Sequence, residues 1–287
     1  LVGSEMCIRD SNSMDLQKIQ SCVVPGDNIE QQGSDWKRGE VIVPAGTRVG
    51  AREMALLFEA GVKRVAGWAS PRVAVVATGS EITQEADGLS SGFRRCSNAS
   101  YIAALMSRIG VTDIRTIVVP DDIRQLTRTL VELDAVCDVI ITVGGTGKGK
   151  RDYTRQAVSD AGGVFVGHDT QLDSPFVTAR LPHAGLIGLP GNPLAVMMIV
   201  QCVLLESVRS VFHLPEAPAQ TVEAVMTEDI EAGICGELCV NVNESAAKPL
   251  IKGTGRMRVF DSARGFVRLN GQGIKRGERV RVELFRN

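Results

Sequence analysis

The feature that most constrains the fold is an alternation of short apolar runs and amphipathic stretches between Pro71 and Phe212. The apolar runs, rich in β-branched residues and typical of buried strands, are residues 73–77, 114–119, 139–143 and 186–189. Helical spacing separates them, with Tyr101, Leu105 and Ile109 on one expected helix face and Leu126, Leu130 and Leu133 on another. This pattern predicts a mostly parallel sheet with helices on both faces, and a long apolar helix should follow at residues 194–212.

The segments on either side have a different character. Residues 23–67 are rich in glycine, valine and turn residues, which predicts short strands and one helix at 51–60. After a proline-rich link at 214–218, turns such as Asn270-Gly271 separate short alternating strands of a small β domain. We therefore expect a non-native leader at 1–11, a partial amino-terminal domain at 12–70, an α/β domain at 71–213 and a β domain at 214–287.

Composition narrows the class of protein. A formal net charge of -1 gives no electrostatic footprint for nucleic acid. The longest apolar run, residues 186–211, is interrupted by Pro190, Asn192 and Pro193, so we expect no membrane span. The 7 cysteines are odd in number and scattered, which favours reduced thiols and a cytoplasmic protein.

A glycine-rich loop leaves one of the expected strands, in the sequence ITVGGTGKGKRDYT at residues 141–154. Its glycines can adopt positive φ and turn their N–H groups toward an anion, while Lys148, Lys150 and Arg151 supply positive charge. Asp152 could hold a metal ion or a polar group of the ligand. A Walker A loop is excluded because no Ser or Thr follows the lysine, but an ordinary strand-to-helix turn stays open as the alternative.

Three further loops follow expected strands, namely Thr78-Gly79-Ser80-Glu81, Pro120-Asp121-Asp122 and the stretch 189–193. Ligands of open α/β sheets bind beyond the carboxyl ends of the strands, so the four loops should converge. Carboxylates beside a phosphate-binding loop suit a Mg²⁺-assisted phosphoester reaction. The alternative for Asp121 or Asp122 is a cap on the helix that starts at Ile123.

The ordered motifs VAVVATGSEI, Asn98 before a helix, PDD, ITVGGTGKGKRDYT and IGLPGNP resemble the molybdenum cofactor biosynthesis domain. With PAGTRV upstream and a β domain downstream, the chain looks most like the molybdopterin molybdenumtransferases, the family of MoeA and of the related gephyrin domain. The resemblance implies a three-layer α/β/α molybdopterin-binding domain, a small carboxy-terminal β barrel and part of the amino-terminal domain.

It also implies an enzyme, a transferase that inserts molybdate into adenylylated molybdopterin with Mg²⁺ and releases AMP. By the family's motifs, Glu81, Asp121 and Asp152 would be catalytic, Glu81 and Asp121 would hold the metal, and Asp35 matches the aspartate of a further turn. The cofactor-binding set would be Thr78, Gly79, Asn98, Gly144, Gly145, Thr146, Gly147, Gly149, Pro190, Gly191, Asn192 and Pro193. Implied partners are a second copy in a homodimer, a molybdopterin adenylyltransferase and a recipient molybdoenzyme.

Three departures from the family keep other functions open. Ser80 stands where the family has an aspartate, residues 167–175 carry no lysine, and the family's sequence before Val23 is missing. A non-catalytic protein that binds or delivers molybdopterin is the first alternative. A molybdopterin adenylyltransferase is the second, although that family normally lacks both the PAGT segment and the β domain.

Overall fold

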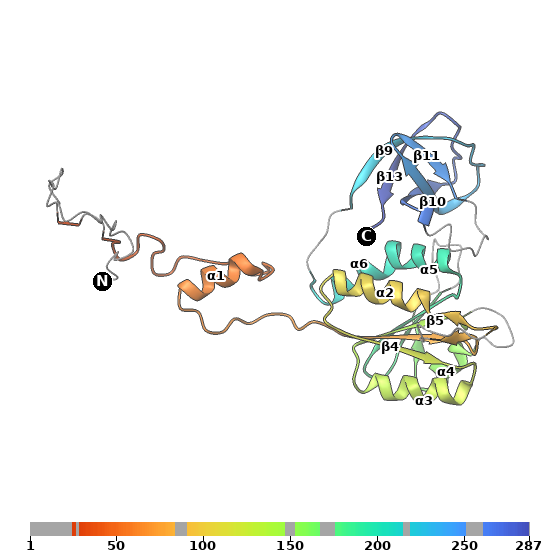
Figure 1. Cartoon of the computed structure of the whole chain (residues 1–287), viewed down its shortest axis with the longest axis horizontal. Helices are drawn as coiled ribbons and strands as arrows, with labels where there is room; N and C mark the ends of the chain where they lie inside the picture. The colour runs from red at the N-terminus through yellow and green to blue at the C-terminus, as the bar shows by residue number, and fades with distance from the viewer. Residues whose placement is uncertain are drawn as a thin grey trace. The chain divides into compact units, whose positions relative to one another are not determined.

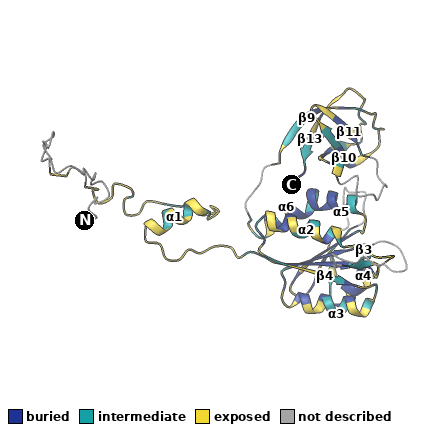
Figure 2. Cartoon of the chain, in the orientation of Figure 1, coloured by how far each residue is buried: buried dark blue, intermediate teal, exposed yellow. Residues whose placement is uncertain are grey.

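The computed structural model describes residues 25–26, 29–83, 91–146, 153–166, 176–214, 219–250 and 261–286. The chain divides into two compact units, Leu1–Gly67 and Trp68–Asn287. In the described part of the first unit, helix α1 (Ala51–Glu59) lies at the position expected for a helix. The carboxylate of Glu53 accepts a hydrogen bond from the Gly50 N–H at 3.0 Å and so closes the first turn. No residue of α1 is buried within this unit, as Figure 2 shows.

The second unit is built on a six-stranded sheet in the order β4-β1-β5-β8-β7-β6. Its strands are β4 (Asp113–Val119), β1 (Arg72–Thr78), β5 (Val139–Val143), β8 (Gly185–Leu189), β7 (Val177–Arg180) and β6 (Val164–Phe165). The first four are parallel, as predicted, whereas β7 and β6 are antiparallel to their neighbours. The sheet is therefore mixed, because the short turn at residues 181–184 joins β7 directly to β8 without a crossover.

Helices cover both faces of this sheet, with α2, α5 and α6 on one side and α3 and α4 on the other (Figure 1). Their bounds are α2 (Ser97–Arg108), α3 (Ile123–Asp134), α4 (Thr154–Asp160), α5 (Pro193–Ile199), η2 (Val200–Leu204) and α6 (Leu205–Val211). Side chains alternate along β1, so Val73 and Val75 join the α2 side of the core while Ala74 and Val76 join the α3 side. A small second sheet pairs β2 (Ile82–Thr83) with β3 (Arg94–Arg95).

The stretch from Pro193 to Val211 forms one continuous helix made of α5, the π-helical turn η2 and α6. Its length and its mean hydropathy of 1.8 would allow a membrane span, contrary to the expectation of an interrupted run. Pro193 does not interrupt it, because proline is tolerated in the first turn, where its missing N–H has no helical partner. The most apolar window of this helix is 56% buried inside the protein, so much of the helix belongs to the core.

Residues after the link form a closed five-stranded barrel in the order β10-β11-β9-β13-β12. The strands are β9 (Thr221–Met226), β10 (Cys235–Asn243), β11 (Ala246–Pro249), β12 (Gly265–Asn270) and β13 (Arg279–Leu284). Its core includes the fully buried Met226, Val240 and Val282. The predicted fold class, an α/β layered domain with a small carboxy-terminal barrel, is confirmed.

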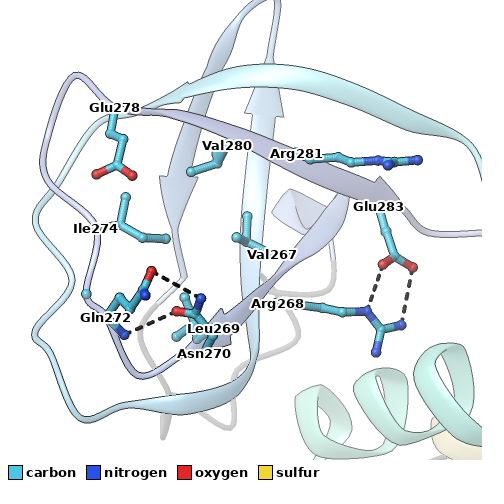
Figure 3. Close-up of a pocket in the computed structure, with 11 residues that line it drawn as sticks. Val267, Arg268, Leu269, Asn270, Gln272, Ile274, Glu278, Val280, Arg281 and Glu283 are labelled. Atoms are coloured by element: carbon cyan, nitrogen blue, oxygen red, sulfur yellow. Dashed lines mark hydrogen bonds and ion pairs between the residues drawn. The ribbon is translucent and has the colours of Figure 1, made fainter.

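The barrel has a hollow of about 310 Å³ between β12 and β13, which pair only at Gly265↔Leu284 and Phe266↔Glu283 before they diverge. Arg268 at its rim is fixed by an ion pair with Glu283 at 2.8 Å, as Figure 3 shows. None of the residues predicted to bind the ligand lines this hollow.

The buried carboxylate of Asp134, the last residue of α3, holds the turn between β7 and β8. Its Oδ1 accepts hydrogen bonds from the N–H groups of His183 (3.0 Å) and Ala184 (2.8 Å), and its Oδ2 lies 2.9 Å from His183 Nδ1. Burial alone would raise the pKa of Asp134, but the hydrogen bonds from His183 and Ala184 outweigh burial and lower it. The carboxylate thus stabilises the fold in its ionised form.

We expect Asp134→Ala to lower the free energy of unfolding by about 3 kcal/mol at pH 7, because two buried N–H groups lose a charged acceptor. Because the pKa of Asp134 is lowered in the folded protein, its carboxylate stabilises the fold fully at pH values above the ordinary aspartate pKa of ~3.9. This stabilisation is lost as the pH falls through the folded-state pKa. Urea unfolding at pH 7, 5 and 3 should therefore show the difference between wild type and variant shrinking at the lowest pH. The control Asp160→Ala removes an exposed hydrogen bond with Gln156 and should change the free energy of unfolding little. If the destabilisation by Asp134→Ala did not depend on pH, the ionised carboxylate would not be the stabilising form.

Candidate functional site

The carboxyl ends of the neighbouring parallel strands β4, β1, β5 and β8 share one edge of the sheet, and the four predicted loops begin there. Hydrogen bonds join the first two loops directly. The N–H of Gly79, after β1, donates to the carbonyl oxygen of Val119, the last residue of β4, at 3.1 Å. The N–H of Asp121 donates to the hydroxyl oxygen of Ser80 at 3.0 Å. The structure therefore brings the Thr78–Glu81 turn and the Asp121 turn together.

Gly144 connects the loop after β5 to two other loops. Its N–H donates to the carbonyl oxygen of Leu189 at 2.9 Å, and its φ is +98°. A Cβ atom at this position would lie 2.7 Å from Thr78 Oγ1 and 2.8 Å from the Thr78 carbonyl oxygen. Only glycine permits both this backbone conformation and this approach of the two chain segments.

Thr154, at the start of α4, holds the same loop through two hydrogen bonds. It is fully buried; its hydroxyl donates to the Gly144 carbonyl oxygen and its N–H to the Gly145 carbonyl oxygen, both at 3.1 Å. A Cβ on Gly145, whose φ is +65°, would lie 2.9 Å from Thr154 Oγ1. Sequence reasoning assigned Thr154 no role, and its place at the end of the glycine-loop motif was the only signal for it.

Two buried hydroxyl groups lie below the loop. Thr142 is 0% exposed and Thr146 is 2% exposed, and neither Oγ1 has a hydrogen-bond partner within the described parts of the chain. Both pack beside Gly188, where a Cβ would lie 3.0 Å from Thr142 Oγ1 and 3.1 Å from Thr146 Cγ2. A buried hydroxyl without a partner is costly, so these two groups are polar atoms that the described part of the protein leaves unsatisfied beside the loop.

The two candidate asparagines have different roles. Asn98 lies in the first turn of α2, which begins at Ser97, rather than before the helix as expected. Its Nδ2 donates to the Gly191 carbonyl oxygen at 3.0 Å, and its buried Oδ1 has no partner among the described residues. Asn192 caps α5, since its Oδ1 accepts from the N–H groups of Leu194 and Ala195 at 3.0 and 3.2 Å. The oxygen of Asn192 is therefore used by the helix, and Pro190 and Gly191 complete the turn before it.

The acidic residues of these loops also differ in their roles. Asp122 is the N-cap of α3 and accepts from the Gln125 N–H at 2.8 Å, so the capping alternative holds for Asp122 and leaves Asp121 available. The carboxylates of Glu81 and Asp121 have no hydrogen-bond partner in the part of the chain that the structure describes. Within that same part, no group of three or more His, Cys, Asp or Glu side chains could hold a metal ion. Among the described residues of this edge, Glu81 and Asp121 are therefore the carboxylates that a metal ion could use.

Several predicted residues cannot be placed. Gly147, Lys148, Gly149, Lys150, Arg151 and Asp152, together with the lysine-free stretch 167–175, lie outside the described residues. Asp35 is exposed in the first unit, which is described by itself. The catalytic role of Asp152 and the ligand contacts of Gly147 and Gly149 stay predictions.

Comparison with known families shows that the α/β domain is similar to molybdopterin-binding domains. Residues 74–210 match the family described as "Probable molybdopterin binding domain", and residues 2–61 match "MoeA N-terminal region (domain I and II)". The chain carries both of these domains and is homologous to molybdopterin molybdenumtransferases and to gephyrin.

Individual relatives agree with these matches. The molybdopterin molybdenumtransferase of Bacillus subtilis is 29% identical over 224 residues, 77% of this chain and 52% of the relative. That of Haemophilus influenzae is 27% identical over 175 residues, 61% of this chain and 43% of the relative. The molybdopterin biosynthesis MoeA protein of Pyrococcus horikosii shares the fold, with a TM-score of 0.74 at 24% identity over 88% of this chain and 64% of that one. The chain spans about half the length of the curated relatives it matches.

We expect Gly144→Ala to destabilise the protein more than Gly110→Ala does. Gly110 has a similar φ of +103°, but a Cβ at that position would meet nothing within 4 Å, so its substitution measures backbone strain alone, about 1–2 kcal/mol. The added overlap with Thr78 should cost Gly144→Ala a further 1–3 kcal/mol, roughly. Chemical denaturation of both variants measures the difference. Equal losses would show that the loop after β5 can move away from β1 at no cost.

Proposed function

We propose that this chain acts in molybdenum cofactor biosynthesis as a molybdopterin molybdenumtransferase, inserting molybdate into adenylylated molybdopterin with release of AMP. The observation that carries the proposal is the hydrogen-bonded edge of four loops, in a domain that matches the molybdopterin-binding family. Curated homologues are transferases of this name, which supports the same activity. The activity is argued for this chain from its site, since a shared fold alone does not determine chemistry.

The residues at the edge fit the ligands that this reaction needs. Gly144 and Gly145 offer a backbone surface without side chains, and the unpartnered hydroxyl of Thr146 could donate to an anionic group of the pterin. The amide of Asn98 presents an unpartnered oxygen to the polar ring edge of a pterin. The N-terminus of α2 adds a partial positive charge to the same edge.

Glu81 and Asp121 would hold Mg²⁺. Carboxylate oxygens suit this hard cation, which commonly takes one or two carboxylates and keeps several waters, so two available carboxylates fit it. When bound, the cation neutralises negative charge on the phosphate and molybdate oxygens. The chain's own part is to hold the anions apart from bulk water and in a fixed orientation. Asp152 is proposed to contribute from the end of the glycine loop.

A binding or delivery protein without catalysis is the second candidate. Helix α1, in the described part of the first unit, buries none of its own residues, which supports this candidate. A cytoplasmic homodimer that receives its substrate from a molybdopterin adenylyltransferase, or passes product to a molybdoenzyme, accompanies either candidate as a proposal.

The deciding experiment supplies the purified chain with adenylylated molybdopterin, molybdate and MgCl₂ as the only other components. AMP release, followed by chromatography, and activation of a cofactor-free molybdoenzyme are the two readouts. Both should require molybdate and should be lost when EDTA removes the metal. Stoichiometric pterin binding without AMP release would replace the transferase with the delivery function, and absence of binding would overturn both.

We expect Glu81→Gln and Asp121→Asn each to reduce turnover by a factor of about 100 or more while the melting temperature stays close to wild type, because each removes a charged metal ligand. Asp122→Ala is the matched control from the same turn as Asp121. It should lose about 1 kcal/mol of stability with the α3 cap but keep its turnover. A carboxylate variant that retains full turnover would leave the mechanism without that residue.

A further inference from the structure

A buried glutamine in the long helix joins three parts of the second unit. Gln201 is 6% exposed, and its Nε2 donates to the hydroxyl oxygen of Tyr101 and to the carbonyl oxygen of Arg286, both at 3.0 Å. Its Oε1 accepts from the Arg286 N–H, also at 3.0 Å. The side-chain amide thus pairs with the Arg286 backbone as one strand residue pairs with another, and its polar capacity is satisfied. We refer to these three contacts as the Gln201 bridge.

The local backbone explains how Gln201 reaches both partners. It lies in η2, a π-helical turn between α5 and α6. Such turns are rare, carry an extra residue per turn and often occur at functional positions within otherwise regular helices. The extra residue changes the facing of the side chains that follow. The π turn therefore has a structural role here, because it is the part of the helix from which Gln201 contacts both Tyr101 and Arg286.

The two partners of Gln201 belong to different parts of the unit: Tyr101 lies on α2, which begins at the candidate site, and Arg286 lies at the end of the barrel. Tyr101 lies one turn along α2 from Asn98, and Asn98 itself bonds the Gly191 carbonyl oxygen just before α5. Gln201 is on the continuous helix that begins at Pro193. Arg286 follows β13, the last barrel strand. The bridge consequently ties the two helices that start at the site to the end of the barrel.

An apolar contact surrounds the bridge. Met197 and Met198 from α5 pack with Cys239, Phe266 and Phe285 from the barrel side. Phe266 and Phe285 have ring centroids 6.0 Å apart. Because apolar contacts do not set direction, directional contacts such as the hydrogen bonds of Gln201 are needed to fix the barrel in one register on the helix.

We propose that Gln201 is a positioning residue that docks the barrel and, through Tyr101, sets the spacing of α2 and α5 at the candidate site. This inference rests on the proposed function, since it concerns binding of the pterin at that site. Opening of the barrel would free α2 to shift relative to the Gly191 turn. Ligand affinity should therefore depend on barrel docking even though the barrel supplies none of the predicted site residues.

Two cysteines at this contact, the buried Cys239 and the half-buried Cys202, report docking without any need for activity. Cys202 lies in η2 and Cys239 in β10, both at the apolar contact. Burial raises the pKa of Cys239 to about 12 and also raises that of Cys202, so both thiols should react slowly while the barrel is docked. Cys235 on the same strand is exposed and serves as an internal reference.

The first experiment compares Gln201→Met with wild type by alkylation with iodoacetamide and mass spectrometry. Methionine keeps the volume and removes all three hydrogen bonds, so Cys202 and Cys239 should react on the order of tenfold faster, with Cys235 unchanged. Arg286→Ala is the matched control, because the bridge uses only the Arg286 backbone; it removes the side chain's ion pair with Glu206 and should leave both thiols protected. Should Gln201→Met not fold, Gln201→Glu, which keeps the acceptor for the Arg286 N–H, replaces it.

The second experiment separates positioning from docking with Tyr101→Phe, which removes the hydroxyl that forms the α2 arm of the bridge and leaves both contacts of Gln201 with Arg286 in place. This variant should keep Cys202 and Cys239 protected yet bind molybdopterin roughly three- to tenfold more weakly, with the loss in KM rather than kcat. Faster alkylation of Gln201→Met with unchanged molybdopterin affinity would overturn the positioning role, and unchanged alkylation would overturn the docking role. If wild type binds no molybdopterin, the proposed function fails, whereas the alkylation comparison still decides docking.

Discussion

The close approach of Gly144 to Thr78 is the contact on which the candidate site depends. Two parallel strands end side by side, and the loop of one crosses directly over the last residue of the other, leaving no room for a Cβ atom. The hydrogen bond from the Gly144 N–H to Leu189 and that from Thr154 to the Gly144 carbonyl oxygen hold the loop in this place. A single backbone position thereby sets the relation of the loops after β1, β5 and β8.

Much of this fold follows from periodicity in the sequence. The apolar runs at 73–77 and 139–143 are short, rich in β-branched residues and separated by stretches with helical apolar spacing, which favours buried strands, and both are strands in the structure. The antiparallel pair β6 and β7 escaped prediction because short strands with mixed exposure carry no clear period. The turn from β7 to β8 is anchored by Asp134, which is distant in the sequence. Contacts between distant residues of this kind leave no local signal.

In the candidate site, too, the sequence predicts features set by neighbouring residues but not those set by contacts between distant residues. Glycines that need positive φ, and a carboxylate after a strand, can be recognised from the sequence. Which of two adjacent aspartates caps a helix cannot, since Asp121 and Asp122 differ only in which side chain meets the Gln125 N–H once the helix has formed. Likewise, the LPGNP motif marked Asn192 as a ligand residue, but capping of α5 explains its oxygen locally. Thr154 and Thr142 look like ordinary polar residues in the sequence, and only the structure shows that both are fully buried.

Ser80 shows how a departure from a family pattern can keep one physical role and lose another. Its hydroxyl oxygen accepts the Asp121 N–H and so joins the two acidic turns, a link that an aspartate could also make. Serine makes it without a charge. A third carboxylate between Glu81 and Asp121 would raise the affinity for a divalent cation but would also increase repulsion among the carboxylates when the cation is absent. The serine therefore keeps the link between the two turns and leaves the proposed metal site with two carboxylates, Glu81 and Asp121.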